Sequence, residues 1–363
     1  MGWYLKGLIS FCAVMAETGS MWSGTPSLTS ALIAILMALI MATDVLAQQA
    51  PDPALEQILN DAKSLRPLEA VVIAQSGTVL AERGYRGHSP AASTNIKSAS
   101  KSIISALVGI AIDKGLLESE DQLIAPLLES DLPKTPDPRI RDITIGNLLS
   151  MQAGLGRTSG RNYGRWVASK NWVRAALAQP FSDDPGGVML YSTGSTHLLS
   201  AILTRVSGRS TLALTRDWLG PVENFSISAW DKDPQGIYLG GNQMAMSTRS
   251  LLAFADLYAN GGRTRDGRQI ISEDWIETSW RHRTNSRFTG DAYGYCWFMR
   301  RIGGHDVKYA WGFGGQMLYI VPALDLVVAM TSNDGAPAGR TGHRANLHRL
   351  MSRIIGAVEA EMK

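Results

Sequence analysis

Cysteine and charged residues are both scarce in this sequence. Its 363 residues contain two cysteines, and charged residues make up 18% of the chain. The 35 Lys and Arg residues form no basic run, so the charge pattern gives no reason to expect a nucleic-acid partner. Apolar residues make up 45%, enough to bury a large core. We therefore expect one large domain, or two closely packed ones, acting on a small molecule.

Two common catalytic signatures are also absent. The sequence contains no Gly-x-Ser-x-Gly turn, and its six histidines form no His-Glu-x-x-His pair. His343 and His348 fall on a predicted helix, where we expect surface residues and not metal ligands. Gly312-x-Gly314 is similar to the start of a dinucleotide fingerprint, but a strand and not a helix is expected to follow it. We therefore predict neither a catalytic metal nor a cofactor.

The first fifty residues differ from the rest of the chain. They contain two apolar stretches, at 2–15 and 31–42, and only one basic residue. The second stretch is followed by a small-x-small sequence that ends at Ala47, as at a signal-peptidase site. We therefore predict that 1–47 is a signal peptide and that the protein is exported, to the periplasm or the medium. An uncleaved membrane anchor is the alternative. Cleavage would leave Cys296 as the only cysteine, so no intrachain disulfide would form.

Sheet and helix patterns follow one another along the remaining chain. Segments 68–74 and 77–85 are rich in β-forming residues and lie two residues apart, which predicts an antiparallel hairpin. Strand patterns return at 293–300, 307–310, 316–321 and 326–331, and a helix is predicted at 340–362. We predict an α/β (α+β) fold, an antiparallel sheet flanked by N- and C-terminal helices. Within a catalytic domain at 48–363, the α/β part takes about 52–97 and 240–363, and a mostly helical insertion takes about 98–239.

The Ser-x-x-Lys sequence from Ser98 to Lys101 lies where a loop is expected to meet a long apolar helix. Residues three apart on a helix share one face, so the lysine amine can reach the serine hydroxyl and act as its base. That role requires a pKa well below about 10.4, and burial among apolar residues lowers the pKa of an ammonium group. The N–H of Ser98 would point at an oxyanion from the helix N-terminus. A helix merely capped by Ser98, with Lys101 in solvent, is the alternative.

Two further segments follow in the order that this chemistry needs. Tyr191 comes after a Pro-Gly turn and before a predicted helix near Gly194, so it can lean into a cleft. Its phenolate, stabilised by a nearby ammonium, is a candidate second proton carrier. The glycine-rich segment 310–316 would let a ligand approach the backbone, with the N–H of Phe313 as second oxyanion donor. A tyrosine packed at a loop corner and a bulge in a sheet are the alternatives.

Together, these segments resemble the serine β-lactamase and penicillin-binding-protein superfamily, especially its β-lactamase-related esterases and 6-aminohexanoate-dimer hydrolases. The similarity runs from about Leu68 to the C-terminus and includes the blocks 143–155 and 240–249. It implies that Ser98 is acylated and that Lys101 and Tyr191 share the proton transfers.

The resemblance also implies which groups contact the substrate. The backbone N–H groups of Ser98 and Phe313 would hold the oxyanion. The expected substrate-binding residues are Thr193, Trp311, Gly312 and Gly314.

Two motifs depart from the family pattern. The Tyr-x-Asn element ends in Thr193, and Ala310 stands where the Lys-Thr-Gly element has its lysine. In β-lactam-binding members that lysine helps to hold the substrate carboxylate. The absence of the lysine therefore favours an ester or amide substrate that lacks this carboxylate, unless an arginine elsewhere compensates. The sequence therefore predicts a serine hydrolase for ester or amide bonds of small molecules. A β-lactamase or D-Ala-D-Ala carboxypeptidase is one alternative, and a catalytically degenerate ligand-binding or sensor protein of the same fold is another.

Overall fold

The computed structural model describes residues 52–362 of the chain. The predicted signal peptide or anchor at 1–47 lies outside these residues. Within 52–362, no helix combines the length and the apolar character that crossing a membrane requires.

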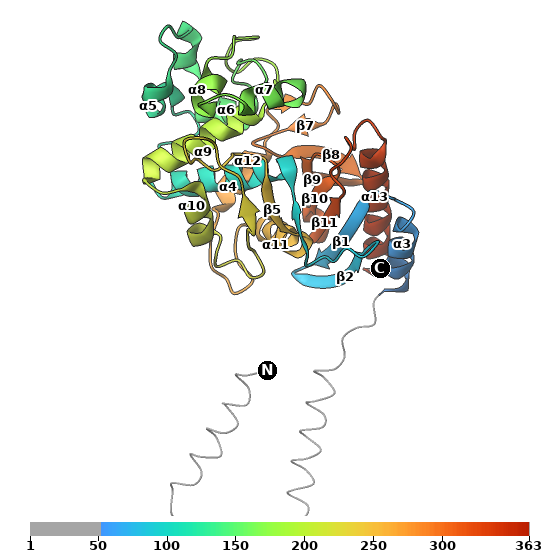
Figure 1. Cartoon of the computed structure of the whole chain (residues 1–363). Helices are drawn as coiled ribbons and strands as arrows, with labels where there is room; N and C mark the ends of the chain where they lie inside the picture. Colours follow the sequence, from blue (N-terminus) through green and yellow to red (C-terminus); the bar gives the residue numbers. More distant parts are fainter. Residues whose placement is uncertain (1–51, 363) are drawn as a thin grey trace, which may run out of the picture. The chain divides into compact units, whose positions relative to one another are not determined.

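Eight antiparallel strands form the main sheet, in the order β2-β1-β11-β10-β9-β8-β7-β6. Figure 1 labels the strands from β2 to β7. The last strand of the chain, β11, therefore lies between the first strand and β10, and joins the two ends of the described chain into one sheet. The predicted antiparallel sheet is confirmed. The strands are β1 (Leu68–Gln75), β2 (Thr78–Gly84), β6 (Thr284–Asn285), β7 (Ala292–Tyr293), β8 (Phe298–Ile302), β9 (His305–Gly312), β10 (Gln316–Val321) and β11 (Leu326–Ser332).

The β1–β2 connection shows why the sequence forms a hairpin at this point. Its two turn residues, Ser76 and Gly77, both have a positive φ, 49° and 80°. Two-residue turns with this backbone match the right-handed twist of the strands that they join. The predicted hairpin is therefore present, with Gln75 paired to Thr78 at its end.

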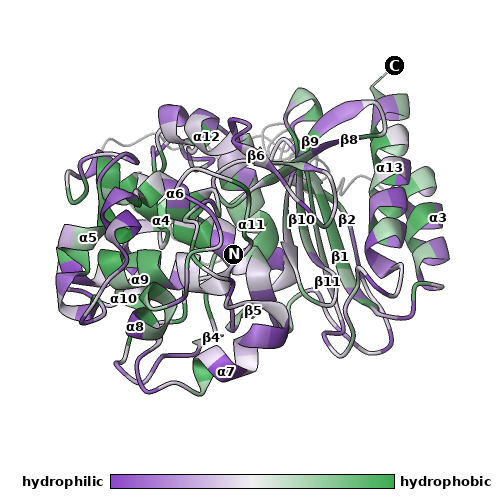
Figure 2. Cartoon of the chain, turned by 90° about the horizontal axis from the view of Figure 1, so that it is seen from above, coloured by the Kyte–Doolittle hydropathy of each residue, from purple (hydrophilic) through white to green (hydrophobic). Residues whose placement is uncertain are grey.

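Helices cover both faces of the main sheet (Figure 2). The helices α3 (Pro53–Ala62) and α13 (His343–Glu361) pack against each other on one face. On the other face, α11 (Thr248–Ala259) contacts β1, β10 and β11. The α3 helix begins at Asp52, whose carboxylate accepts hydrogen bonds from the N–H groups of Ala54 and Leu55 and so satisfies two free donors of the first turn.

The helical part of the molecule is built around α4 (Ser100–Asp113). This helix is buried from Ser100 to Ala111, because α9, α10 and α12 pack on it and β9 lies at its side. A small sheet in the order β3-β5-β4 lies next to its start. The remaining helices are α5 (Ile124–Leu127), α6 (Ile145–Leu149), α7 (Tyr163–Val167), α8 (Trp172–Leu177), α9 (Thr193–Ser207), α10 (Thr211–Trp218) and α12 (Glu273–Trp280). The small strands are β3 (Ser93–Asn95), β4 (Ala229–Trp230) and β5 (Met244–Ser247), and the 3₁₀ turns are η1 (Lys97–Ala99), η2 (Glu129–Asp131), η3 (Pro138–Asp142), η4 (Gly160–Asn162) and η5 (Pro322–Leu324).

Three details differ from the sequence-based expectations. The helix expected from Ser98 begins at Ser100, because residues 97–99 form the tighter 3₁₀ turn η1. The strand expected at 293–300 is two strands, β7 and β8, interrupted where Cys296 has a φ of 65°. His348 is buried and lies 3.0 Å through Nδ1 from the hydroxyl of Tyr319, and His343 is buried too, so the expected surface position of this pair is wrong.

The centre of the sheet should be the most sensitive part of the core. Met330 in β11 is fully buried between Val71 of β1 and Met317 of β10. We expect Met330→Ala to lower the free energy of unfolding by about 2–5 kcal/mol, because the neighbouring strands cannot collapse into the space. Urea unfolding of the full chain measures this. Val79→Ala, at a half-exposed position on the edge strand β2, is the control and should change the free energy by less than about 0.5 kcal/mol. Equal effects of the two changes would contradict this account of the core.

Candidate active site

Ser98 lies in η1, between β3 and the start of α4, on a backbone that polar side chains hold in a strained conformation. The preceding residue, Lys97, has a φ of 50°, which a non-glycine residue rarely adopts. Its Nζ lies 2.8 Å from Oδ2 of Asp334 and 3.2 Å from Oε1 of Gln243. Its N–H donates to Oδ1 of Asn95 at 3.0 Å. Strain of this kind persists where the surroundings over-determine it, often at functional sites.

Lys101 is buried beside this serine. Its side chain is 1% exposed, and its Nζ lies 3.1 Å from Oγ of Ser98. Nζ also donates to the carbonyl oxygen of Gly241 at 2.6 Å and lies 3.4 Å from Oγ1 of Thr193. Burial lowers the pKa of Lys101 from its ordinary value of 10.5 to about 7. The alternative of a helix capped by Ser98 with a solvated lysine is wrong, because the N-cap residue is Ala99.

Tyr191 also lies close to the amine, two residues before α9 begins at Thr193. Its ring centroid is 5.2 Å from Nζ of Lys101, and the ring stacks on Phe298 at 6.2 Å. Burial raises the pKa of Tyr191 above its ordinary value, and a side-chain hydrogen bond with Ser98 acts in the opposite direction. Burial therefore favours the neutral phenol in the resting site, and the role of Tyr191 as a second proton carrier stays a prediction.

The glycine-rich segment forms the turn between β9 and β10. Gly312 pairs with Gln316, so the turn itself consists of residues 313–315. A Cβ on Gly312 would lie 2.2 Å from the carbonyl oxygen of Ile96, so only glycine lets this strand end lie against the loop that carries Ser98. Within 52–362, no hydrogen bond is recorded from the N–H of Ser98 or of Phe313. Both groups are therefore free to bind an oxygen atom.

A cavity of about 600 Å³ brings most of the predicted site residues together. Ser98, Tyr191, Thr193, Trp311 and Phe313 all line it. Three predicted residues do not line it: Lys101 is buried behind Ser98, Gly312 is buried, and Gly314 faces a different cavity.

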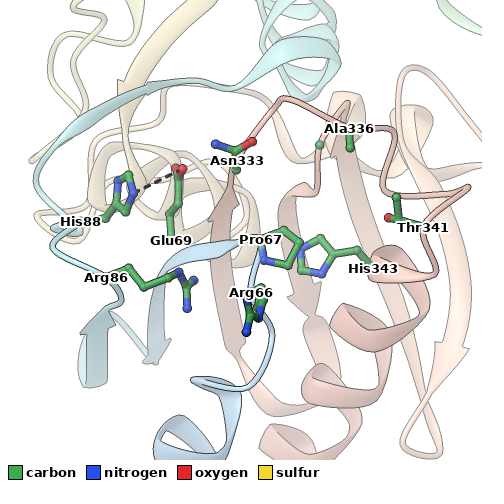
Figure 3. Close-up of a pocket in the computed structure, with 10 residues that line it drawn as sticks. Arg66, Pro67, Glu69, Arg86, His88, Asn333, Ala336, Thr341 and His343 are labelled. Carbon is green, nitrogen blue, oxygen red and sulfur yellow. Dashed lines mark ion pairs between the residues drawn. The ribbon is translucent and has the colours of Figure 1, made fainter.

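That second cavity, of about 420 Å³, lies beyond the turn and is shown in Figure 3. Arg66 and Arg86 line it, together with His88, whose Nε2 lies 3.5 Å from Oε1 of Glu69. Gly314 has a φ of 87°, and a Cβ there would lie 2.7 Å from the carbonyl oxygen of Asn333, which accounts for the glycine. The lining residues of this cavity include no serine, cysteine or lysine, so it offers no counterpart of the Ser98–Lys101 pair.

Sequence reasoning gave no role to several residues of the site, and three of them matter most. Gly241 supplies the carbonyl that holds Nζ of Lys101, and Gln243 helps to hold Lys97. Both lie in the block 240–249, which the family resemblance marked without giving them a role. Arg157 lines the cavity, and no sequence signal distinguishes it from other loop arginines.

The described residues give no support for a metal centre. Within 52–362, no group of three or more His, Cys, Asp or Glu side chains is placed to hold a metal ion. Cys296 lies near Lys101, but burial raises the pKa of its thiol to about 12, so it remains protonated and unreactive.

Comparison with known proteins agrees with this geometry. The family model described as Beta-lactamase matches residues 62–351. The chain belongs to the beta-lactamase family. The resemblance drawn from the Ser98, Tyr191 and 310–316 segments is therefore confirmed, and family members are generally hydrolases.

Solved structures of this family have the same fold at low sequence identity. A Bacillus anthracis protein provisionally named a 6-aminohexanoate-dimer hydrolase aligns with a TM-score of 0.67 and 19% identity, over 85% of this chain and 82% of that chain. A penicillin-binding protein homologue from Caulobacter crescentus aligns with a TM-score of 0.67 and 18% identity, over 84% of this chain and 96% of that chain. EstCE1, described as a hydrolase with promiscuous acyltransferase activity, aligns with a TM-score of 0.64 and 18% identity, over 84% of this chain and 97% of that chain.

Among curated sequences, the probable fimbrial assembly protein FimD, serogroup H1, of Dichelobacter nodosus is 34% identical over 144 residues. The match covers 38% of this beta-lactamase-family chain and 36% of FimD, so the two share only about a third of the relative's length.

The contact between Gly241 and Lys101 can be tested with a pair of glycines. A Cβ at Gly241 would lie 2.5 Å from Cγ of Lys101, whereas one at Gly236 would have no atom within 4 Å. Both residues have a positive φ, 79° and 84°, so the two alanine variants carry similar backbone strain. We expect Gly241→Ala to slow labelling of Ser98 by a fluorophosphonate on the order of 100-fold, because the amine is displaced. Gly236→Ala should label at a rate near that of the wild type. Similar rates for the two variants would show that the position of Lys101 does not matter.

Proposed function

We propose that this protein hydrolyses ester or amide bonds of small molecules through an acyl-enzyme on Ser98. The observation that carries the proposal is the buried amine of Lys101, 3.1 Å from Oγ of Ser98. A serine hydroxyl is a weak nucleophile at neutral pH and needs an adjacent base. An amine with a pKa of about 7 is partly neutral under these conditions and can accept the hydroxyl proton.

In the first half of the proposed reaction, Oγ of Ser98 attacks the carbonyl carbon and its proton passes to Nζ of Lys101. The N–H groups of Ser98 and Phe313 stabilise the oxyanion, and each donor is expected to contribute about 2.7–4 kcal/mol to lowering the barrier. The tetrahedral intermediate then collapses, and the bond to the leaving group breaks. The neutral phenol of Tyr191 donates its proton to the departing oxygen or nitrogen and regains one from the ammonium of Lys101.

In the second half, water attacks the acyl carbon and gives its proton to the same relay. The acid product leaves, and the Ser98 hydroxyl is restored. Neither half requires a cofactor, because every proton that is removed returns to a leaving group or to Ser98.

The β9 strand supports acyclic esters and amides as the substrate class. Ala310 is 1% exposed and has no charge, so this strand carries no cation at the position where the family pattern has its lysine. The similarity to EstCE1 and to the Bacillus anthracis protein favours the same class. The similarity to the Caulobacter crescentus homologue supports the alternative of a β-lactam substrate.

Labelling and turnover together test the proposal. We expect the full chain to react with a fluorophosphonate and to hydrolyse p-nitrophenyl esters, and Ser98→Ala to lose both activities. Ser105→Ala is the matched control, because Ser105 lies on α4, the helix that follows the Ser98 turn, is fully buried, and its hydroxyl makes no hydrogen bond within 52–362. Mass spectrometry of the labelled protein and initial rates with the ester series measure these outcomes.

Other outcomes would support the alternatives. Labelling of Ser98 without turnover of any ester or short linear amide would indicate a ligand-binding or sensor protein. Hydrolysis of nitrocefin at rates equal to or above those of the esters would indicate a β-lactamase. Unchanged labelling of Ser98→Ala would exclude this serine as the nucleophile.

The pKa of Lys101 makes a prediction about pH. Below about pH 7 the amine is an ammonium and cannot accept a proton, so kcat/KM for a neutral ester should fall about tenfold per pH unit as the pH decreases. Above pH 7 it should level off. Lys101→Met should be slower by about 10²–10⁴-fold at pH 8 and should lose this inflection.

A stability measurement checks the same pKa without catalysis. Between pH 7 and 9 the unfolded chain holds a proton on Lys101 that the folded chain lacks, so the free energy of unfolding should rise with pH. Relative to Lys101→Met, the wild type should gain up to about 1.4 kcal/mol per pH unit in this range. Parallel curves for the two proteins would show that the amine is not neutral in the folded state.

A further inference from the structure

We infer that Arg157 makes the cavity selective for esters and amides that carry a carboxylate, which its guanidinium binds. The inference rests on the proposed function, because it names the class of substrate that the Ser98 site would take. Arg157 also provides a cation in this cavity, next to which the β9 strand has Ala310 in place of the family lysine.

The first argument is the position of Arg157. It lies on the loop between α6 and η4 and lines the same cavity as Ser98. Its Nε donates to the carbonyl oxygen of Tyr191 at 2.9 Å, and its guanidinium carbon lies 4.7 Å from the ring centroid of Phe288. These two contacts fix the plane of the guanidinium but use only one of its five N–H groups. The other N–H groups remain available for a bidentate partner such as a carboxylate.

The second argument is charge. Within 52–362, no ion pair to an acidic side chain includes Arg157. The other charged residues that line the cavity, Lys97 and Asp334, neutralise each other at 2.8 Å. Partial burial and the nearby Arg161 both lower the pKa of Arg157, so its charge is incompletely solvated and lies beside a second cation. A bound anion would relieve both effects.

The third argument is the apolar surface around this cation. Phe288 and Phe313 are 57% and 47% exposed, and both line the cavity. Large apolar side chains that remain exposed around a concave site commonly mark ligand contacts. An arginine that lies against the Phe288 ring and has no acidic partner within 52–362 suits a substrate that combines an apolar chain with one carboxylate, such as a half-ester or half-amide of a dicarboxylic acid.

Matched substrates test the inference. p-Nitrophenyl pentanoate and the p-nitrophenyl half-ester of glutaric acid have acyl chains of five carbons, and only the second carries a carboxylate. A second pair consists of phenyl acetate and 4-acetoxybenzoate, and in the latter the carboxylate lies on the leaving group. For each pair we divide kcat/KM of the anionic substrate by kcat/KM of the neutral one. We expect this ratio to be about 10- to 100-fold higher in the wild type than in Arg157→Gln for at least one pair. This preference should fall as the ionic strength rises.

Variants separate charge recognition from support of the Tyr191 loop. Arg157→Lys keeps the positive charge and should keep part of the preference, whereas Arg165→Gln, at an exposed arginine on α7, should keep all of it. A direct measurement uses Ser98→Ala, which does not turn over: monomethyl glutarate should bind to it at least tenfold more tightly than to Ser98→Ala/Arg157→Gln in calorimetry.

The possible results distinguish the two levels of the proposal. Ser98-dependent hydrolysis of the neutral esters, with equal anionic-to-neutral ratios in the wild type and in Arg157→Gln for both pairs, would overturn the inference and leave the proposed function standing. Loss of all turnover and labelling in the wild type would instead overturn the proposed function. Equal binding of monomethyl glutarate to the two Ser98→Ala proteins would also contradict the role of Arg157.

Discussion

The structure depends on keeping one lysine amine out of water. An ammonium group loses solvation when it is buried, and only a small part of that loss is offset at Lys101, by the carbonyl oxygen of Gly241. The apolar packing of α9, α10, α12 and β9 around α4 stabilises the helix and offsets this unfavourable free energy. The same burial lowers the pKa of Lys101 and raises the pKa of Tyr191, so one environment favours the neutral form of both groups near Ser98.

The elements that hold this amine and its serine come from distant parts of the chain. The turn that carries Ser98 is held by the β3–β5 sheet through Asn95 and Gln243, and by Asp334 after β11. The β9–β10 turn lies against the same loop because Gly312 has no side chain. The eight-stranded sheet therefore contributes to the chemistry only indirectly, by fixing where its turns and strand ends lie.

Membership of the beta-lactamase family accounts for the fold and for the Ser98–Lys101 pair, but the residues around them differ from the family pattern. Ala310 leaves β9 without a cation at the position of the family lysine, and Arg157 places one in the cavity that Ser98 lines. Under the proposed function, these two residues would affect which substrate is held, while the Ser98–Lys101 pair would attack its carbonyl.

Local patterns in the sequence determined the β1–β2 hairpin, the final helix and the approach of Lys101 to Ser98, because spacing along a strand, turn or helix decides which neighbours meet. Only the tertiary structure decided the break between β7 and β8, the burial of His348 and the neutral state of the Tyr191 phenol. It also decided which arginine would line the same cavity as Ser98 without an acidic partner within 52–362. These features depend on solvent access and on contacts between residues far apart in sequence, and no local pattern encodes either.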